Sequence, residues 1–431
     1  MAQPARAEDL DEAAAAWLVA SGRDAVAAST ASLDAGASEL AVGQRLRDGG
    51  LDAARASAVM GASLARRRAR LRWRDADRLL LTPSGLEQAS DPAVAAWRAR
   101  RFAQADLTVD AGCGVGGDLL ALANCGAGCV VGVDRDTGRL HLARANVEAL
   151  GLGEHTHVVA GDALALPVRG GLVHADPGRR VAGHRVRHLA DTTPPVGRVL
   201  AIAASGHGVV VGPAVDLGDP DLPADVEIEF VQVGPRLIEA VVWRGELKAP
   251  GAVATATVLA DSAAVGVGEY AVAATRTRRT GTVRQAAGTT PHPRPLGSHL
   301  IVPAPALVRA RLHDEVAHEI GAGRVAIHRA LLTTDDAPAQ SPWWHAWEIE
   351  AVLPARPKAV RRWLATAPRA PLEIELHGPD LSIEPWWSGL RGVDRGPQGR
   401  RLHVIRLDDR AVAVATRPAP AASDSPGAAP R

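Results

Sequence analysis

Apolar residues recur at helical spacing through the first part of the chain. The first such face carries Leu10, Ala14, Trp17 and Leu18. The same spacing continues over residues 54–71, interrupted at Gly61. A turn-forming Thr-Pro-Ser-Gly segment at 82–85 precedes a further predicted helix over residues 86–102. Residues 1–102 are therefore predicted to form a helical N-terminal lobe.

From residue 107 the pattern changes to short β-branched runs that alternate with helical segments. Such alternation is typical of a parallel sheet covered by helices. Five strands are predicted, at residues 107–110, 130–134, 157–160, 172–176 and 209–211. A hairpin of residues 227–233 and 237–243 adds two antiparallel strands. We therefore predict a doubly wound, Rossmann-like α/β core of seven strands over residues 103–248.

The remainder of the chain divides into three parts. Residues 249–302 are rich in Ala, Thr, Gly and Pro with weak periodicity, which predicts a linker or an edge region. Residues 303–417 form a second, smaller α/β block. Its predicted helices are at 306–320 and 358–367, and its predicted strands are at 372–376, 402–407 and 411–415. The Pro- and Ala-rich residues 418–431 are predicted to be a disordered tail.

Composition limits the class of protein. Lys and Arg number 49 against 48 Asp and Glu, so the net charge of +1 excludes a large single-sign field but not local patches. No apolar run reaches the length of a membrane span, and the first ten residues lack an apolar signal core. Three cysteines favour a reducing compartment. Cys125 and Cys129 lack further ligand-spaced partners, so we expect a cytoplasmic protein without a metal site.

The candidate chemistry lies where the first predicted strand meets the next helix. Residues 110–116 read Asp-Ala-Gly-Cys-Gly-Val-Gly. Glycines let the backbone approach a ligand, and the helix start offers free N–H groups. Glycines alone also fit NAD or FAD, but the acid at Asp110 favours a cationic amino ligand such as S-adenosylmethionine over a pyrophosphate. The candidate cofactor-binding residues here are Asp110, Ala111, Gly112, Cys113, Gly114 and Gly116.

Three further acids follow the next predicted strands. Asp134 ends the second strand, where an acid can accept hydrogen bonds from ribose hydroxyls. Asp162 follows the third strand and is a candidate for the adenine amino group. Asp176, followed by Pro177, ends the fourth, where the cofactor's methyl group is expected. A single strand-end aspartate is often only a turn former, so the prediction of one shared crevice rests on their order beside the glycine loop.

These motifs together resemble the class I S-adenosylmethionine-dependent methyltransferases. Asp110 to Gly116 is similar to their first motif, Asp134 and Asp162 to the acids of the second and third strands, and Asp176-Pro177 to the fourth-strand motif. The chain also resembles a mainly bacterial group of these enzymes with a THUMP-like C-terminal domain. That resemblance rests on residues 86–90, 175–180, 227–230, 372–376 and 378–380. It implies a THUMP-like fold for residues 303–417, a module associated with RNA binding.

The sequence departs from that group at two places. Gly178 stands where the group usually has alanine, and residues 299–305 lack two acids that its linker tends to carry. Any role of residues 299–305 in activity is therefore left open.

Asp176 and Pro177 are the predicted catalytic residues. Relatives with Pro-Pro-aromatic after the acid or amide hold a flipped base there, but this chain continues with Gly178, Arg179 and Arg180. We expect Arg179 and Arg180 to bind substrate, because guanidinium planes stack on bases and fork onto phosphates. An equal alternative pairs both arginines with acids of the fold. In-line methyl transfer needs no nucleophilic side chain.

Two clusters elsewhere have both a structural and a functional interpretation. Six arginines between residues 66 and 74 form either a solvated helix end or a phosphate-binding stripe. The tryptophans at 343, 344, 347, 386 and 387 either pack a small domain or stack on single strands. The structural interpretation is favoured for both.

The sequence therefore predicts an S-adenosylmethionine-dependent methyltransferase that acts on an RNA base by direct in-line transfer. RNA is the expected partner, and neither a membrane nor a metal is expected. Two alternatives stay open, a small-molecule methyltransferase and an RNA-binding relative that no longer transfers methyl groups. The sequence indicates neither the modified atom nor the oligomeric state.

Overall fold

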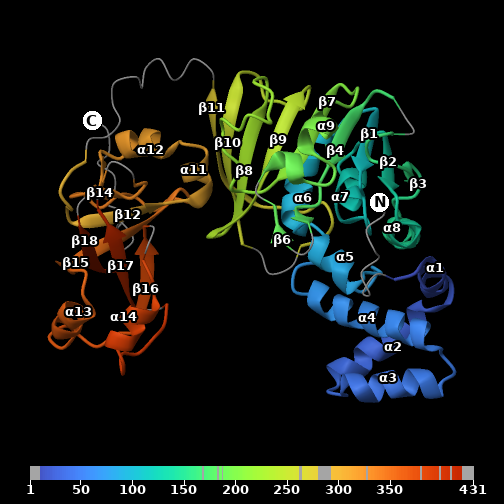
Figure 1. Ribbon diagram of the computed structural model, residues 1–431, viewed down its shortest axis with the longest axis horizontal. Helices are drawn as coiled ribbons and strands as arrows, with labels where there is room; N and C mark the ends of the chain where they lie inside the picture. The colour runs from blue at the N-terminus through green and yellow to red at the C-terminus, as the bar shows by residue number, and fades with distance from the viewer. Residues whose placement is uncertain are drawn as a thin grey trace, which may run out of the picture. The chain divides into compact units, whose positions relative to one another are not determined.

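The computed structural model describes residues 10–166, 169–181, 184–186, 188–261, 265–279, 293–326, 329–378, 381–397, 399–407 and 410–419. The chain divides into two compact units, Met1–Thr277 and Arg278–Arg431. Each unit is a mixed α/β structure built on one large sheet (Figure 1). Residues 420–431, most of the predicted tail, lie outside the described part of the chain.

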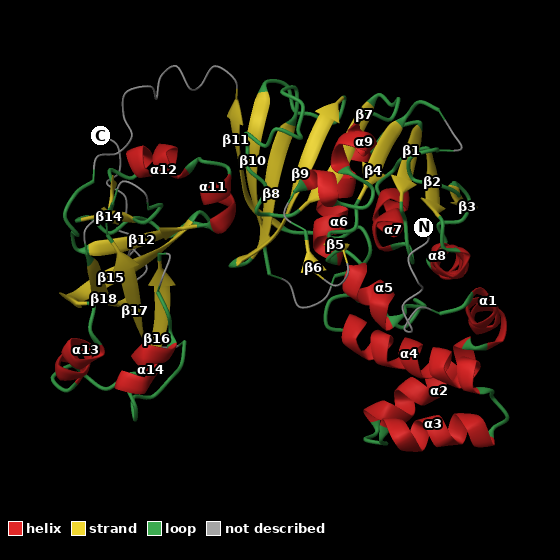
Figure 2. Cartoon of the chain, in the orientation of Figure 1, coloured by secondary structure: helices red, strands yellow, loops and turns green. Residues whose placement is uncertain are grey.

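The predicted N-terminal lobe is helical. It comprises α1 (Glu12–Ser21), α2 (Arg23–Asp34), α3 (Glu39–Asp48) and α4 (Ala53–Ala69), drawn as red coils in Figure 2. The side chains of Asp11, Ser38 and Asp52 cap α1, α3 and α4 by accepting backbone N–H bonds. Helix α4 packs against the other three, so it organises the lobe.

The single helix predicted over residues 86–102 is instead divided. It consists of α5 (Pro83–Gln88), α6 (Pro92–Ala99) and a 3₁₀ turn (Arg100–Phe102). The break falls at Asp91, whose side chain caps α6 at Ala93, and at Pro92, which has no N–H to continue a preceding helix.

The sheet of the first unit contains nine strands rather than the predicted seven. Its order is β11-β10-β8-β9-β7-β4-β1-β2-β3. Parallel pairing joins β7, β4, β1, β2 and β3, while β9 runs antiparallel to both β7 and β8 (Figure 1). The strands of the predicted core are β1 (Leu107–Ala111), β2 (Cys129–Asp134), β3 (Thr156–Ala160), β4 (Leu172–Ala175), β7 (Gly206–Val211), β8 (Glu227–Val233) and β9 (Arg236–Gly245). A short separate hairpin, β5 (Arg180–Val181) with β6 (His184–Arg185), follows β4.

The two additional strands come from residues 249–302, expected to be a linker or an edge region. Strand β10 (Ala252–Leu259) pairs in parallel with β8, and β11 (Val272–Arg279) lies at the edge of the sheet. The small residues of β10 weaken its periodicity, but tertiary contacts bury it. The Thr255 and Thr257 hydroxyls donate to the carboxylates of Glu227 and Glu229 at 2.7 Å.

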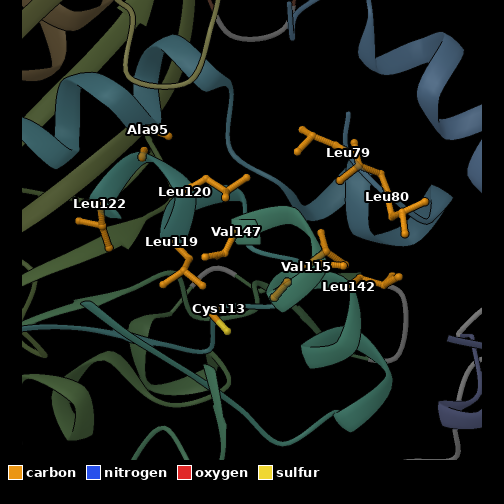
Figure 3. Close-up of a cluster of buried hydrophobic side chains, with 14 of the residues drawn as sticks. Leu79, Leu80, Ala95, Cys113, Val115, Leu119, Leu120, Leu122, Leu142 and Val147 are labelled. Carbon is orange, nitrogen blue, oxygen red and sulfur yellow. The ribbon is translucent and has the colours of Figure 1, made fainter. Parts of the chain in front are cut away.

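Helices α7 (Gly117–Asn124), α8 (Thr137–Ala149) and α9 (Val196–Leu200) connect the parallel strands. The main core packs α7 and α8 against the sheet and the N-terminal helices (Figure 3). Leu119 of α7 is fully buried, and the Cys113 thiol is also buried in this cluster. Burial raises the pKa of Cys113 well above its ordinary value, so this thiol is a packing group.

The second unit has a seven-stranded sheet in the order β13-β14-β12-β15-β18-β17-β16. Strand β12 (His299–Pro303) lies inside this sheet, so the predicted boundary at residue 303 is too late. The predicted helix over 306–320 is two short helices, because Arg311 adopts a positive φ of 57° between them. The remaining elements are α11 (Pro305–Arg309), α12 (His313–Glu319), β13 (Gly323–Arg324), β14 (Leu332–Thr334), β15 (Trp344–Pro354), α13 (Pro357–Leu364), β16 (Leu372–His377), α14 (Glu384–Gly389), β17 (Arg400–Arg406) and β18 (Ala411–Pro418).

Among the described residues, no helix combines the length and apolar character needed to cross a membrane.

Candidate active site

The glycine loop between β1 and α7 has the geometry that a close backbone approach requires. Gly112, Gly114 and Gly116 have φ values of 102°, 55° and 97°, which disfavour residues with a Cβ. The N–H groups of Gly112 and Cys113 both donate to the Val133 carbonyl, at 2.7 and 3.0 Å, which ties the loop to β2. Cβ atoms at Gly112 or Gly114 would meet nothing within 4 Å, so open space faces the loop.

Asp134 sits beside this loop at the end of β2. Its Oδ2 accepts the Gly114 N–H at 2.8 Å, and its Oδ1 accepts the Asp136 N–H at 3.0 Å. Each carboxylate oxygen can accept a further hydrogen bond. The position therefore agrees with the predicted one, and ribose binding by Asp134 stays a prediction.

Asp110 lies beside the glycine loop, as predicted, but its carboxylate is buried. Its side chain is only 2% exposed, and Oδ1 lies 2.9 Å from Nδ1 of His174 on the adjacent strand β4. Burial lowers the pKa of His174, but its bond to Asp110 and the charge of Asp118 outweigh this and raise it. Asp110 Oδ2 is buried without a hydrogen-bond partner among the described residues. Oδ2 is therefore the Asp110 atom with its full hydrogen-bonding capacity available for the predicted contact with a cofactor ammonium group.

Asp162 lies after β3 with its side chain 40% exposed. Its Oδ1 accepts the Leu164 N–H at 2.9 Å, and Oδ2 pairs with the Arg135 guanidinium. The bond from Leu164 and the Arg135 guanidinium lower the pKa of Asp162, so this carboxylate is ionised at neutral pH. Since β4, β1, β2 and β3 are consecutive parallel strands, all four predicted acids do lie along one edge of the sheet.

Asp176 follows β4 directly, two residues beyond the position paired with Asp110. The residue is half-buried, and Pro177 behind it is buried. Desolvation, together with the negative charges of Asp118 and Glu239, raises the pKa of Asp176 to about 7, although Arg179 and Arg98 oppose the shift. A carboxyl that titrates near neutral pH is suited to exchange protons with an acceptor.

A buried ionic network that the sequence did not indicate lies near Asp176 and acts electrostatically on its carboxyl. Arg98, only 2% exposed, pairs with both Asp118 and Glu239 and donates to the Ser90 hydroxyl at 2.9 Å. The opposing charges of Asp118 and Glu239 outweigh desolvation and raise the pKa of Arg98. The one signal in the sequence was isolated charge in apolar surroundings, Arg98 within Ala-Val-Ala-Ala-Trp-Arg-Ala and His174 within Leu-Val-His-Ala.

The segment after Pro177 turns back toward the following chain. Gly178 exchanges two backbone hydrogen bonds with Thr193, at 2.8 and 3.0 Å. Arg179 is half-buried, and its Nη1 has no hydrogen-bond partner among the described residues. A Cβ at Gly212, just after β7, would lie 3.8 Å from that nitrogen, so Arg179 reaches toward the neighbouring strand end. The side chain of Arg180 lies outside the described part of the structure.

The arginine run at residues 66–74 and the tryptophans of the second unit agree with the structural interpretation of each cluster. Five arginines of the 66–74 run have hydrogen-bond or ion-pair partners within the fold. The Arg66 guanidinium donates to Leu79 O, and the ion pairs are Arg67–Asp34, Arg70–Asp34, Arg70–Asp77, Arg72–Asp91 and Arg74–Glu269. The tryptophans at 343, 344, 347 and 386 are buried, with exposed fractions of 6–9%. Trp387 is half-buried, and the Arg395 guanidinium lies 4.2 Å from the centre of its ring.

Comparisons with known proteins agree with this geometry. A family model for the methyltransferase domain matches residues 108–175, which span β1 to β4. Two curated Mycobacterium tuberculosis proteins, both called uncharacterized S-adenosylmethionine-dependent methyltransferases, are 30% identical over 309 residues. The alignment covers 71% of this chain and 78% of each relative. A Porphyromonas gingivalis crystal structure described as that of a possible methyltransferase has a TM-score of 0.69 at 21% identity, covering 91% of this chain and 98% of that one. That likeness concerns the fold alone.

The fold and the glycine loop define a Rossmann-like α/β protein, a class that typically binds nucleotides at the carboxyl ends of its parallel strands. The chain belongs to the S-adenosylmethionine-dependent methyltransferases. It is thus an enzyme whose cofactor is S-adenosylmethionine. The residues present fit that cofactor, because open space faces Gly112 and Gly114, and Asp110 Oδ2 is a buried acceptor without a partner among the described residues.

Proposed function

We propose that this methyltransferase modifies a base of RNA, with the acceptor atom placed beside Asp176. The observation that carries the proposal is the position of Asp176 at the end of β4, on the strand next to β1 and its glycine loop, with a pKa of about 7. Bound S-adenosylmethionine supplies a methyl group on a sulfonium centre, so the residues of the chain have only to orient the acceptor and remove its proton.

Asp176 can perform both tasks. A carboxyl with a pKa near 7 is about half ionised at neutral pH, so its ionised form can accept the proton that an amino or ring nitrogen loses. Before transfer, the same oxygens can accept a hydrogen bond from that N–H and thereby hold the acceptor in line. Pro177 is buried and fixes the backbone immediately after the acid.

Arg179 favours an acceptor that carries a π-face or a negative charge. Its guanidinium can stack on a base or donate to a phosphate, and its Nη1 has no hydrogen-bond partner among the described residues. The predicted likeness of residues 303–417 to a THUMP module is a second, independent reason to propose RNA. On that proposal, Arg179 and Arg180 contact the substrate while Asp110, Asp134, Asp162 and the glycine loop hold the cofactor.

A small-molecule acceptor is the second candidate. It is favoured because the tryptophans of the second unit are mostly buried, and because the arginines of residues 66–74 are largely paired with acids. Neither cluster therefore offers the extended basic and aromatic surface that binds single strands without sequence preference. A small substrate would need only the half-buried surroundings of Asp176 and Arg179.

The test is methyl transfer from S-adenosylmethionine with a tritiated methyl group. Purified protein is incubated with total RNA, or with a metabolite extract, from a strain that lacks the gene and from its parent. Label that enters RNA from the deletion strain but not parental RNA supports the proposal. Label confined to the metabolite extract supports the second candidate. Salt-sensitive RNA binding without any transfer points to a relative that binds RNA only.

Two variants locate the chemistry. Asp176→Asn should reduce transfer about 100-fold or more, because general base catalysis contributes at least that factor. The matched control, Asp191→Asn, changes an exposed acid in the 3₁₀ turn after the β5–β6 hairpin and should transfer normally. Equal activity of the two variants would place the acceptor elsewhere.

A further inference from the structure

Three metal-ligand side chains meet on one face of the sheet in the second unit. Glu375 and His377 are two residues apart on β16, so both point to the same side of the strand. The register of the parallel pair β16–β17 sets His403 directly beside Glu375. The opposite face of the same strands carries the apolar residues that pack against α13 and α14, which keeps all three ligands on the other side.

The ligand atoms are close enough to share one ion. His377 Nε2 lies 3.0 Å from His403 Nδ1, 3.7 Å separates His377 Nε2 from Glu375 Oε1, and 3.6 Å separates His403 Nδ1 from Glu375 Oε2. A tetrahedral zinc ion with bonds of about 2.0–2.1 Å has ligands separated by roughly 3.3–3.4 Å. The observed separations bracket that spacing, so small side-chain rotations would complete the geometry.

Burial makes this group unusual for a sheet surface. His403 is fully buried, and His377 and Glu375 have side-chain exposures of 14% and 35%. The rings of the two histidines are stacked with centroids 5.2 Å apart, and Trp347 covers His403 edge-on at 5.6 Å. The second ring nitrogen of His403, Nε2, has no hydrogen-bond partner among the described residues. His377 Nε2 and His403 Nδ1 lie within hydrogen-bond distance of each other, and an ion bound between them would replace that contact with two coordinate bonds.

The neighbouring Arg401 restricts which oxygen of Glu375 can bind an ion and opposes a cation by its charge. Its guanidinium pairs with Glu373 and lies 3.3 Å from Glu375 Oε2, and it also covers the Trp347 ring at 4.4 Å. This pair occupies Oε2 and leaves Oε1 of Glu375 on the side of His377. The positive charge of Arg401 opposes a cation, so the site must rely on the two imidazoles for most of its affinity.

We propose that Glu375, His377 and His403 bind one zinc ion, with water completing the coordination. Two imidazoles and a carboxylate form a set that suits zinc, whereas magnesium and calcium prefer oxygen ligands alone. Strand β16 is at the edge of its sheet and has β17 as its sheet neighbour. An ion that joins the two strands would therefore fasten that edge. The sequence predicted no metal because Glu375 and His377 offer only two ligands at close spacing, and the third, His403, comes from the neighbouring strand β17.

The test is zinc binding by the full chain after chelation and dialysis, followed by titration calorimetry and elemental analysis. We expect one zinc ion per chain. His377→Ala and Glu375→Gln should each weaken binding at least about tenfold, since even groups that only orient a ligand change metal affinity by that factor. Zinc should also raise the melting temperature of the parent protein but not of His377→Ala. Circular dichroism of both variants without zinc confirms that they are folded.

Two control variants separate this site from other sources of zinc binding. Glu373→Gln removes another carboxylate that pairs with Arg401, but not a proposed ligand, and should leave zinc affinity unchanged. Cys125→Ser removes a thiol of the first unit and should also change nothing. The absence of stoichiometric zinc, or an affinity equally strong in His377→Ala, would overturn the proposal.

Discussion

Replacing Asp176 with asparagine should stabilise the protein while it removes activity. The carboxyl has a pKa of about 7 instead of 3.8, because desolvation and the charges of Asp118 and Glu239 disfavour its ionised form. The ionised carboxylate of Asp176 therefore lowers the stability of the folded protein at neutral pH. Asparagine has nearly the same shape and no charge, so Asp176→Asn relieves that cost.

The size and the pH window of the effect follow from linkage. Each tenfold change in the ionisation equilibrium is worth about 1.4 kcal/mol, so the raised pKa of Asp176 corresponds to a cost of about 4 kcal/mol once the group is ionised. The folded protein holds the proton more tightly than the unfolded chain does. The cost is therefore absent below about pH 4, grows as the pH rises and is complete above about pH 7. Between pH 5 and pH 8 it should grow by about 2–3 kcal/mol.

Urea unfolding of the parent and Asp176→Asn at pH 5 and pH 8 measures this difference, with the fluorescence of tryptophans such as buried Trp243 as the probe. Other titrating groups cancel because both proteins share them. The variant should gain stability over the parent as the pH rises. A constant difference between the two proteins, or a variant that is less stable at pH 8, would refute a desolvated carboxyl at this position.

Three further predictions concern the cofactor loop and its support. Asp134→Ala should abolish measurable S-adenosylmethionine binding by calorimetry, because it removes the acceptor for Gly114 N–H as well as the proposed ribose contact; normal affinity would contradict both roles. Gly112→Ala should cost about 1–3 kcal/mol of stability through strain at φ 102°, and should weaken cofactor binding because the new Cβ enters the open space; denaturation and calorimetry check the two effects. Arg98→Met should cost about 3–5 kcal/mol, because Asp118 and Glu239 would lose their buried partner; an unchanged urea midpoint would contradict this.

The hydrophobic pattern of a segment predicted its secondary structure correctly where the packing around that segment favours the same structure. The strands ending at Asp110 and Asp134 were predicted with nearly their observed bounds, because β-branched runs bounded by turns need only be buried on both faces. The pattern failed where contacts with residues distant in the sequence determine the structure. Strand β10 looks weak as a sequence, yet Glu227 and Glu229 bind its threonine hydroxyls and bury it.

The order of acids and glycines along the chain predicted the kind of enzyme and the edge of the sheet where its cofactor is expected. Parallel strands bring their carboxyl ends together whatever else the chain does, so sequence order alone implied one site. Only the tertiary structure decided what each charge faces. Asp110 is paired with His174 inside the protein, Arg98 joins Asp118 to Glu239, and His403 of β17 lies beside Glu375 and His377 of β16. Such contacts depend on burial and on distances between distant residues, and no local spacing records them.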